Sequence, residues 1–118
     1  MAEAAEYQAL DSKFKYLFAI FMLFSYNYNM RFEYDPKKSA SNKKKHGITL
    51  ELAKSLWQGF YIEITAKTVD EPRYMVIGKI ENKLYSCVFT MRHDVVRLIS
   101  ARRSRKSEEA LYYGHFKK

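Results

Sequence analysis

The chain has 118 residues, a formal net charge of +8 and a single cysteine, Cys87. This length suits one domain, and one cysteine excludes both an internal disulfide bond and a cysteine-based metal site. The basic excess favours nucleic acid or an anionic lipid surface as partner. Absence of a disulfide suits a reducing cytoplasm, which is the localisation we expect. Because Cys87 stands within an apolar run, we predict an inert core residue.

The first 29 residues differ in composition from the rest. They carry a net charge of −1, which leaves +9 on residues 30–118. Their apolar run, residues 16–24, is shorter than the about 20 apolar residues that cross a bilayer, and acidic residues precede it, unlike in a signal peptide. We interpret residues 1–29 as an N-terminal extension produced by an overlong start-codon assignment, and residues 30–118 as the functional domain. The alternative is an amphipathic helix, Lys13 to Tyr26, that covers the core or a partner.

A short strand over residues 31–34 is followed by a predicted helix over residues 36–46. Asp35 is a good N-cap, proline fits the first helical turn, and Gly47 supplies the C-terminal stop. Lysines fill much of this helix. We therefore expect it to bury only a thin stripe around Ala40.

A second helix is predicted from its cap at Thr49 to its stop at Gly59. Apolar side chains recur within it at helical spacing, which predicts one buried face. That expected face consists of Leu52, Ala53, Leu56 and Trp57.

Four further strands and a terminal helix complete the expected fold. The strands are predicted over residues 60–67, 73–80, 84–92 and 96–103, and the helix over 104–115. Short connectors at residues 81–83 and 93–95 demand antiparallel hairpins, with Ile80 opposite Leu84. The fold class is α+β: an antiparallel β-sheet meander of four to five strands, two helices inserted after the first strand, and a C-terminal helix.

The arginines fall at two ends of this expected sheet. Arg73 begins one strand and Arg92 ends the next, so a closed hairpin places both at the same end, where Arg97 also falls. Arg102 and Arg103 lie at the opposite end. One cluster can grip a phosphate backbone while the other does chemistry. For any single arginine, a solvated surface charge is the alternative.

RNA is the polyanion that a small basic protein can cleave with least equipment, because its 2′-hydroxyl serves as the nucleophile. The protein must supply a base, an acid and a cation for the pentavalent phosphorane. Glu71 and His46 are candidates for proton transfer. The alternatives are a surface ion pair for Glu71 and a favourable helix C-terminus for His46. No histidine pair has metal-ligand spacing, and no glycine-rich phosphate loop occurs.

Several motifs appear in an order that is typical of one family. They are Phe32-Glu33-Tyr34-Asp35-Pro36-Lys37-Lys38, Asn42-x-x-Lys45-His46-Gly47, Glu71-x-Arg73-Tyr74-x-x-Ile77-Gly78, Thr90-x-Arg92 and Arg97-Leu98-Ile99-Ser100-Ala101-Arg102-Arg103. From Met30 onward the chain resembles the BrnT-type toxins of bacterial type II toxin-antitoxin systems. Residues 1–29 have no counterpart in this resemblance.

The resemblance implies a RelE-like endoribonuclease that cleaves RNA by 2′-hydroxyl attack, leaves a cyclic phosphate and inhibits translation. It implies no metal or other cofactor. The implied partner is a BrnA-type ribbon-helix-helix antitoxin, which gives the complex an indirect contact to DNA; no membrane partner is expected. The expected catalytic residues are Glu71, Arg73, Arg92 and His46. The expected RNA-binding residues are Lys45, Arg97, Ser100, Arg102 and Arg103.

Two other functions fit the same basic surface. A non-catalytic nucleic-acid-binding module would use the arginines only to grip phosphate, with steep salt dependence and no cleaved product. An antitoxin-docking subunit would use them to hold an acidic segment of its partner.

Overall fold

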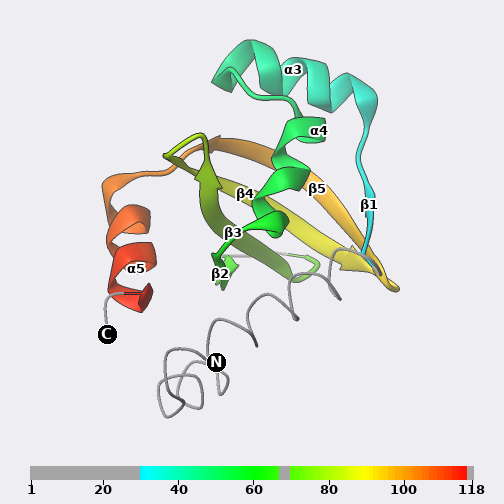
Figure 1. Ribbon diagram of the computed structural model, residues 1–118. Helices are drawn as coiled ribbons and strands as arrows, with labels where there is room; N and C mark the ends of the chain where they lie inside the picture. Colours follow the sequence, from blue (N-terminus) through cyan, green and yellow to red (C-terminus); the bar gives the residue numbers. More distant parts are fainter. Residues whose placement is uncertain (1–29, 67–69, 117–118) are drawn as a thin grey trace.

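The computed structural model describes residues 30–66 and 70–116, so the interpretation of residues 1–29 lies outside the described part (Figure 1). These residues form one five-stranded sheet, in the order β1-β5-β4-β3-β2, with helices packed against it. The elements are β1 Arg31–Glu33, α3 Pro36–His46, α4 Leu50–Ala53, the 3₁₀ helix η1 Lys54–Gln58, β2 Tyr61–Ala66, β3 Arg73–Ile80, β4 Lys83–Arg92, β5 Val95–Arg103 and α5 Lys106–Phe116. The α+β class is confirmed. None of the helices in this described part is long and apolar enough to cross a membrane.

The sheet is mixed, so the prediction of an antiparallel sheet is wrong for one strand pair. Strands β2 to β5 form the expected antiparallel meander, but β1 runs parallel to β5. The physical reason is connectivity. A hairpin forces its two strands to be antiparallel, whereas β1 and β5 are separated by the rest of the fold and no tight turn constrains their directions.

The hairpins are tighter than the sequence indicates. Glu81 and Asn82 both have positive φ, 51° and 68°, and form a two-residue turn. Such turns match the right-handed twist of the flanking strands. Ile80 therefore pairs with Lys83, not with Leu84, and the predicted register is wrong by one residue.

Helix α3 has the predicted bounds and caps. The Asp35 carboxylate accepts a hydrogen bond from the Lys37 amide at 2.9 Å, and Gly47 closes the helix with φ 77°. The buried positions are Ser39 and Asn42, whereas Ala40 is exposed, so the expected apolar stripe is wrong. The helix is attached by polar contacts instead.

The second helix begins at Leu50 as α4 and tightens into η1 after Ala53. This change from 3.6 to about 3 residues per turn rotates the buried face. Leu52 is consequently 49% exposed, against the prediction, while Leu50 is fully buried. Gly78 permits the close approach of η1, because a Cβ there would lie 3.2 Å from the Leu56 carbonyl oxygen.

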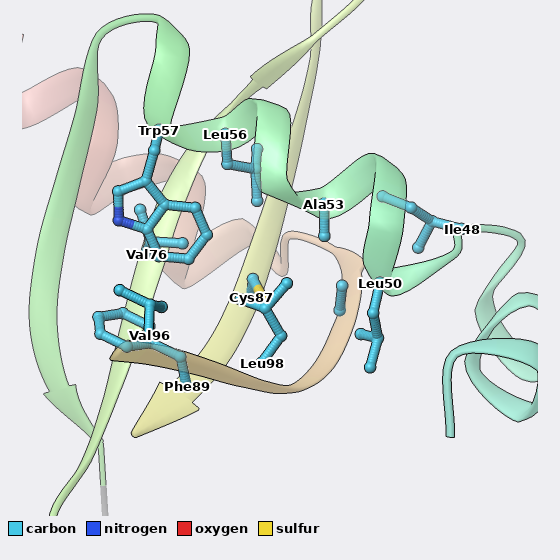
Figure 2. Close-up of a cluster of buried hydrophobic side chains, with 11 residues drawn as sticks. Ile48, Leu50, Ala53, Leu56, Trp57, Val76, Cys87, Phe89, Val96 and Leu98 are labelled. Atoms are coloured by element: carbon cyan, nitrogen blue, oxygen red, sulfur yellow. The ribbon is translucent and has the colours of Figure 1, made fainter. Parts of the chain in front are cut away.

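The main core lies between the sheet and the layer of α4 and η1 (Figure 2). The Trp57 ring packs edge-on against Phe32 and Phe89, with centroids 5.1 and 5.2 Å apart. Cys87 is fully buried in this cluster, which confirms the predicted core role. Burial raises the pKa of its thiol to about 12, which makes it a poor nucleophile.

The opposite side of the sheet carries α5, and we call it the α5 face. Tyr112 packs there against Ile62, Ile77 and Leu84. Because side chains alternate along a strand, Ile77 points away from the main core to which its neighbour Val76 belongs. The two faces therefore have separate apolar clusters, and α5 packs on the cluster formed by β2, β3 and β4.

Candidate functional site

A row of polar side chains crosses the α5 face beyond helix α5. Thr90 on β4 pairs with Arg97 on β5, and extending the β3–β4 register by one residue places Arg73 on the other side of Thr90. Their neighbours Tyr74 and Phe89 pack in the main core, so these three side chains point to the α5 face. We call Arg73, Thr90 and Arg97 the arginine row. With strands about 4.8 Å apart, the two arginine backbones lie about 10 Å from each other.

Glu71 and Arg92 lie beside this row. Arg92 follows Thr90 by two residues and therefore points to the same face. Its guanidinium is 3.7 Å from the Glu71 carboxylate, and both side chains are about half exposed. The structure thus brings together Glu71 and Arg92, which are separated by 21 positions in the sequence.

Thr90 holds the connector that carries Glu71. Its hydroxyl donates a hydrogen bond of 2.7 Å to the Pro72 carbonyl oxygen, and the residue is only 2% exposed. Pro72 stands between Glu71 and Arg73 in the chain. This hydrogen bond therefore fixes the backbone between Glu71 and Arg73 relative to the end of β4.

Arg97 is fixed from the opposite side by Glu33. The two residues are register partners across the parallel β1–β5 pair, and the guanidinium donates to the carboxylate at 2.5 Å. Arg97 is only partly exposed and already has an anionic partner. Its charge is thereby held in place at the β1 edge of the row.

Arg73 has no such partner among the described residues. Among the ion pairs of the described residues, none involves Arg73, and the residue is exposed. A guanidinium offers five N–H donors in a planar fork that matches two phosphate oxygens. Arg73 is therefore the member of the row best placed to receive a phosphate group.

The far end of β5 holds a different arrangement. Arg102 donates two hydrogen bonds of 2.8 Å to the Glu108 carboxylate, which also accepts from the Ser86 hydroxyl and the Arg105 amide. We call this group the Glu108 clasp. The Arg102 hydrogen bonds lower the pKa of Glu108 to about 2 despite its burial. Arg102 is thus engaged within the protein.

The remaining predicted RNA-binding residues are spread along the molecule. Arg103 lies at the end of β5 with its guanidinium over the Tyr85 ring, 5.6 Å from the centroid. Ser100 is half-buried on the α5 face, opposite Val88. Lys45 is exposed near the end of α3. Lys45 and Arg103 lie away from the arginine row, whereas Ser100 lies next to it on the same face, because its partner Val88 precedes Thr90 by two residues.

His46, predicted as catalytic, lies at the last position of α3. One turn earlier, Asn42 binds the backbone of Ala101, which pairs with Cys87 on β4. Cys87 precedes Arg92 by five residues, which corresponds to about 17 Å along a strand. The structure therefore places His46 toward the other end of the sheet, in the layer that also contains α4.

Sequence reasoning missed two residues that position the site, Glu33 and Thr90. Each of them belongs to one of the sequence motifs, but its role depends on which residues it faces across neighbouring strands. Thr90 is a polar residue within a mostly apolar stretch, residues 84–91, which is the signal that could have identified it. Within the described ranges, no three His, Cys, Asp or Glu side chains group together in a way that could hold a metal ion.

A small, basic α+β protein with arginines fixed in a row beside a carboxylate has the features of a phosphodiester-binding protein. Residues 34–108 match the family model described as "Ribonuclease toxin, BrnT, of type II toxin-antitoxin system". This span covers more than half of the chain, and the chain therefore belongs to the BrnT family of ribonuclease toxins. The resemblance inferred from the motifs is confirmed. A search of curated proteins found no match.

Proposed function

We propose that this protein is a metal-independent endoribonuclease whose catalytic site is the arginine row with Glu71 and Arg92. The observation that supports this most is the convergence of these groups at one end of the α5 face. In the proposed reaction, the RNA 2′-hydroxyl gives up its proton and attacks the adjacent phosphorus, and the bond to the 5′-oxygen breaks as that oxygen takes a proton from water. The products are a 2′,3′-cyclic phosphate and a 5′-hydroxyl.

Arg73 and Arg92 stabilise the phosphorane in this proposal, and Arg97 binds the phosphate backbone. Charge on the equatorial oxygens grows as the phosphorane forms, so fixed guanidinium groups favour the transition state over the substrate. The Arg92 pairing orients Glu71 toward the same face, where its carboxylate can accept the 2′-hydroxyl proton. Because His46 lies at the other end of the sheet, Glu71 is the better candidate for this step.

Lys45 and Arg103 are proposed to contact RNA away from the cleaved bond, and Ser100 is proposed to contact it beside the arginine row. Arg102 differs from them, since both of its terminal nitrogens already bind Glu108. We assign it an indirect role, which is to hold the start of α5 against β4 and β5. This division follows from the contacts and the exposure of each side chain.

The reaction class is tested by incubating the purified full chain with a defined RNA in the presence of EDTA. We expect cleaved products with 2′,3′-cyclic phosphate and 5′-hydroxyl ends, and loss of cutting when the nucleotide 5′ to the cut carries a 2′-deoxy sugar. Binding without any product would instead indicate a non-catalytic module. Cleavage that requires a divalent ion would contradict the metal-independent mechanism.

We further propose a BrnA-type ribbon-helix-helix antitoxin as the partner, bound so that it blocks RNA access, with DNA contacted through the antitoxin. The family's type II system supports an antitoxin partner. Co-expression with the neighbouring open reading frame should give a stable complex that no longer cleaves RNA. A complex that cleaves as fast as the free chain would contradict inhibition by site coverage.

A further inference from the structure

Helix α3 presents a face made almost entirely of lysine. Lys37 and Lys44 are seven residues apart, so they point the same way, about 10 Å from each other along the axis. Lys38 and Lys45 flank them, and all four are exposed. We call these four residues the lysine face. None of the ion pairs found within the described residues involves a lysine of α3.

This charge array is held rigidly. On the opposite side of α3, the Ser39 hydroxyl accepts a hydrogen bond from the Leu50 amide at 2.9 Å. The Asn42 side chain exchanges hydrogen bonds with Ala101 in both directions and donates a third to the Ile48 carbonyl oxygen. Buried polar contacts that are fully satisfied fix geometry. The lysine face therefore stays in one orientation relative to β5.

The lysine face lacks the features of a protein interface. Interfaces between proteins are depleted in charge at their centre and depend on aromatic, apolar or arginine anchors. Between its lysines, α3 offers only Ala40 and Ser41. The exposed large apolar side chains of the described residues all lie elsewhere: Leu52, Phe60, Met91, Leu111, Tyr113 and Phe116. The lysine face can therefore attract a partner by charge but offers it no apolar contact. A phosphate backbone is the ligand that suits such a surface.

The lysine face also continues from the arginine row. Glu33, which pairs with Arg97, precedes Lys37 by four residues, so the two backbones are at most about 14 Å apart. Figure 1 shows β1 leading directly from the sheet edge into α3. A strand of nucleic acid bound at Arg97 needs to pass only the β1 edge to reach this helix.

We propose that the lysine face binds the backbone of single-stranded RNA on one side of the cleaved nucleotides. The choice of RNA as the ligand of the lysine face rests on the proposed ribonuclease function. Binding is independent of sequence, because lysine recognises phosphate as a point charge. The helix thereby strengthens the binding of long RNA relative to short fragments. These short fragments include the products that the enzyme releases.

The test compares binding of 2′-O-methyl RNA of 20 nucleotides and of 3 nucleotides by the full chain across a salt series. These oligonucleotides lack the free 2′-hydroxyl, so binding is measured whether or not the protein is a nuclease. The variant is Lys37→Gln with Lys44→Gln. Its matched control is Lys54→Gln with Lys79→Gln, two lysines that already contact Glu51 and the Tyr113 ring. Glutamine has a helix propensity close to that of lysine.

For the 20-nucleotide RNA, the α3 variant should lower the slope of log K against log salt by about 1.4, or roughly 0.7 for each lost phosphate contact. The control pair should leave this slope unchanged, and 3-nucleotide RNA should bind equally to all forms. If the control pair lowers the salt slope by the same amount, the effect comes from the net charge of the protein, and the proposal is overturned. Unchanged binding of the long RNA, or equal weakening of the short RNA, would also overturn it.

Discussion

At the scale of single residues, Thr90 links the packing of the sheet to the proposed chemistry. Its hydroxyl is buried, and its one acceptor is the Pro72 carbonyl, 18 positions away in the sequence. Sequence reasoning identified the arginines because charge at a strand end is visible without a structure. It could not assign Thr90, because that hydrogen bond exists only in the observed register.

Replacing Thr90 by valine keeps the shape of the side chain but removes the hydroxyl that donates to the Pro72 carbonyl oxygen. We expect the Glu71 to Arg73 connector to loosen, so that kcat for RNA cleavage falls about tenfold, a loss of roughly 1.4 kcal/mol of transition-state stabilisation. KM should change little, because Arg97 and the lysine face still bind RNA. Thr90→Ser keeps the hydroxyl and should restore most of kcat. If serine and valine variants lose activity equally, the hydroxyl does not position the site.

At the scale of elements, helix α5 is joined to the sheet by the Glu108 clasp. Glu108 occupies the third position of the helix, where its carboxylate accepts the Arg105 amide that precedes the first turn. This is the reciprocal half of a capping box, and an anion here also suits the positive helix end. Arg102 and Ser86 then tie the same carboxylate to β5 and β4.

The clasp should make stability depend on acid pH. The pKa of Glu108 is about 2 in the folded protein against 4.5 for an ordinary glutamate. The unfolded chain therefore binds more protons between these values, and stability is lost as pH falls from about 4.5 toward 2. Between pH 6 and pH 3 we expect Glu108 to contribute about 1 to 2 kcal/mol to the loss in unfolding free energy, measured with urea.

Glu108→Gln should remove this part of the pH dependence and lower stability at neutral pH. Its control is the adjacent Glu109→Gln, since no hydrogen bond or ion pair joins Glu109 to another side chain of the described residues. The control should retain the wild-type pH profile. Identical profiles for both variants would show that the clasp does not set the acid sensitivity.

Local signals explain which elements the sequence could predict. The caps at Asp35, Gly47 and Thr49 involve residues only a few positions apart, and the predicted starts of these two helices agree with the structure. The terminal helix begins at Lys106, two residues after its predicted start. The buried face of the second helix was wrong at Leu52, because the tightening into η1 depends on the approach of that helix to Gly78. Packing between distant segments, not local propensity, decides such details.

At the scale of the whole molecule, the candidate site combines segments from four strands. The prediction that Arg73, Arg92 and Arg97 share one end of the sheet agrees with the register, although the predicted pairing was shifted by one residue. The parallel β1, which brings Glu33 to Arg97, could not be predicted from hairpin lengths. Nor could sequence place His46, whose distance from the row follows from the packing of α3 on β5.

The most direct test of the central claim is the cleavage rate of a defined RNA by Arg73→Ala, Arg92→Ala and Arg105→Ala variants. Arg105 is an exposed arginine at the start of α5, far along β5 from the arginine row, and serves as the charge-matched control. A charge-assisted contact to phosphate contributes about 1.5 to 3 kcal/mol, so Arg73→Ala and Arg92→Ala should each slow cleavage by well over tenfold. Arg105→Ala should stay within about twofold of wild type, a change of roughly 0.4 kcal/mol. Wild-type rates for both Arg73→Ala and Arg92→Ala would contradict the proposed site.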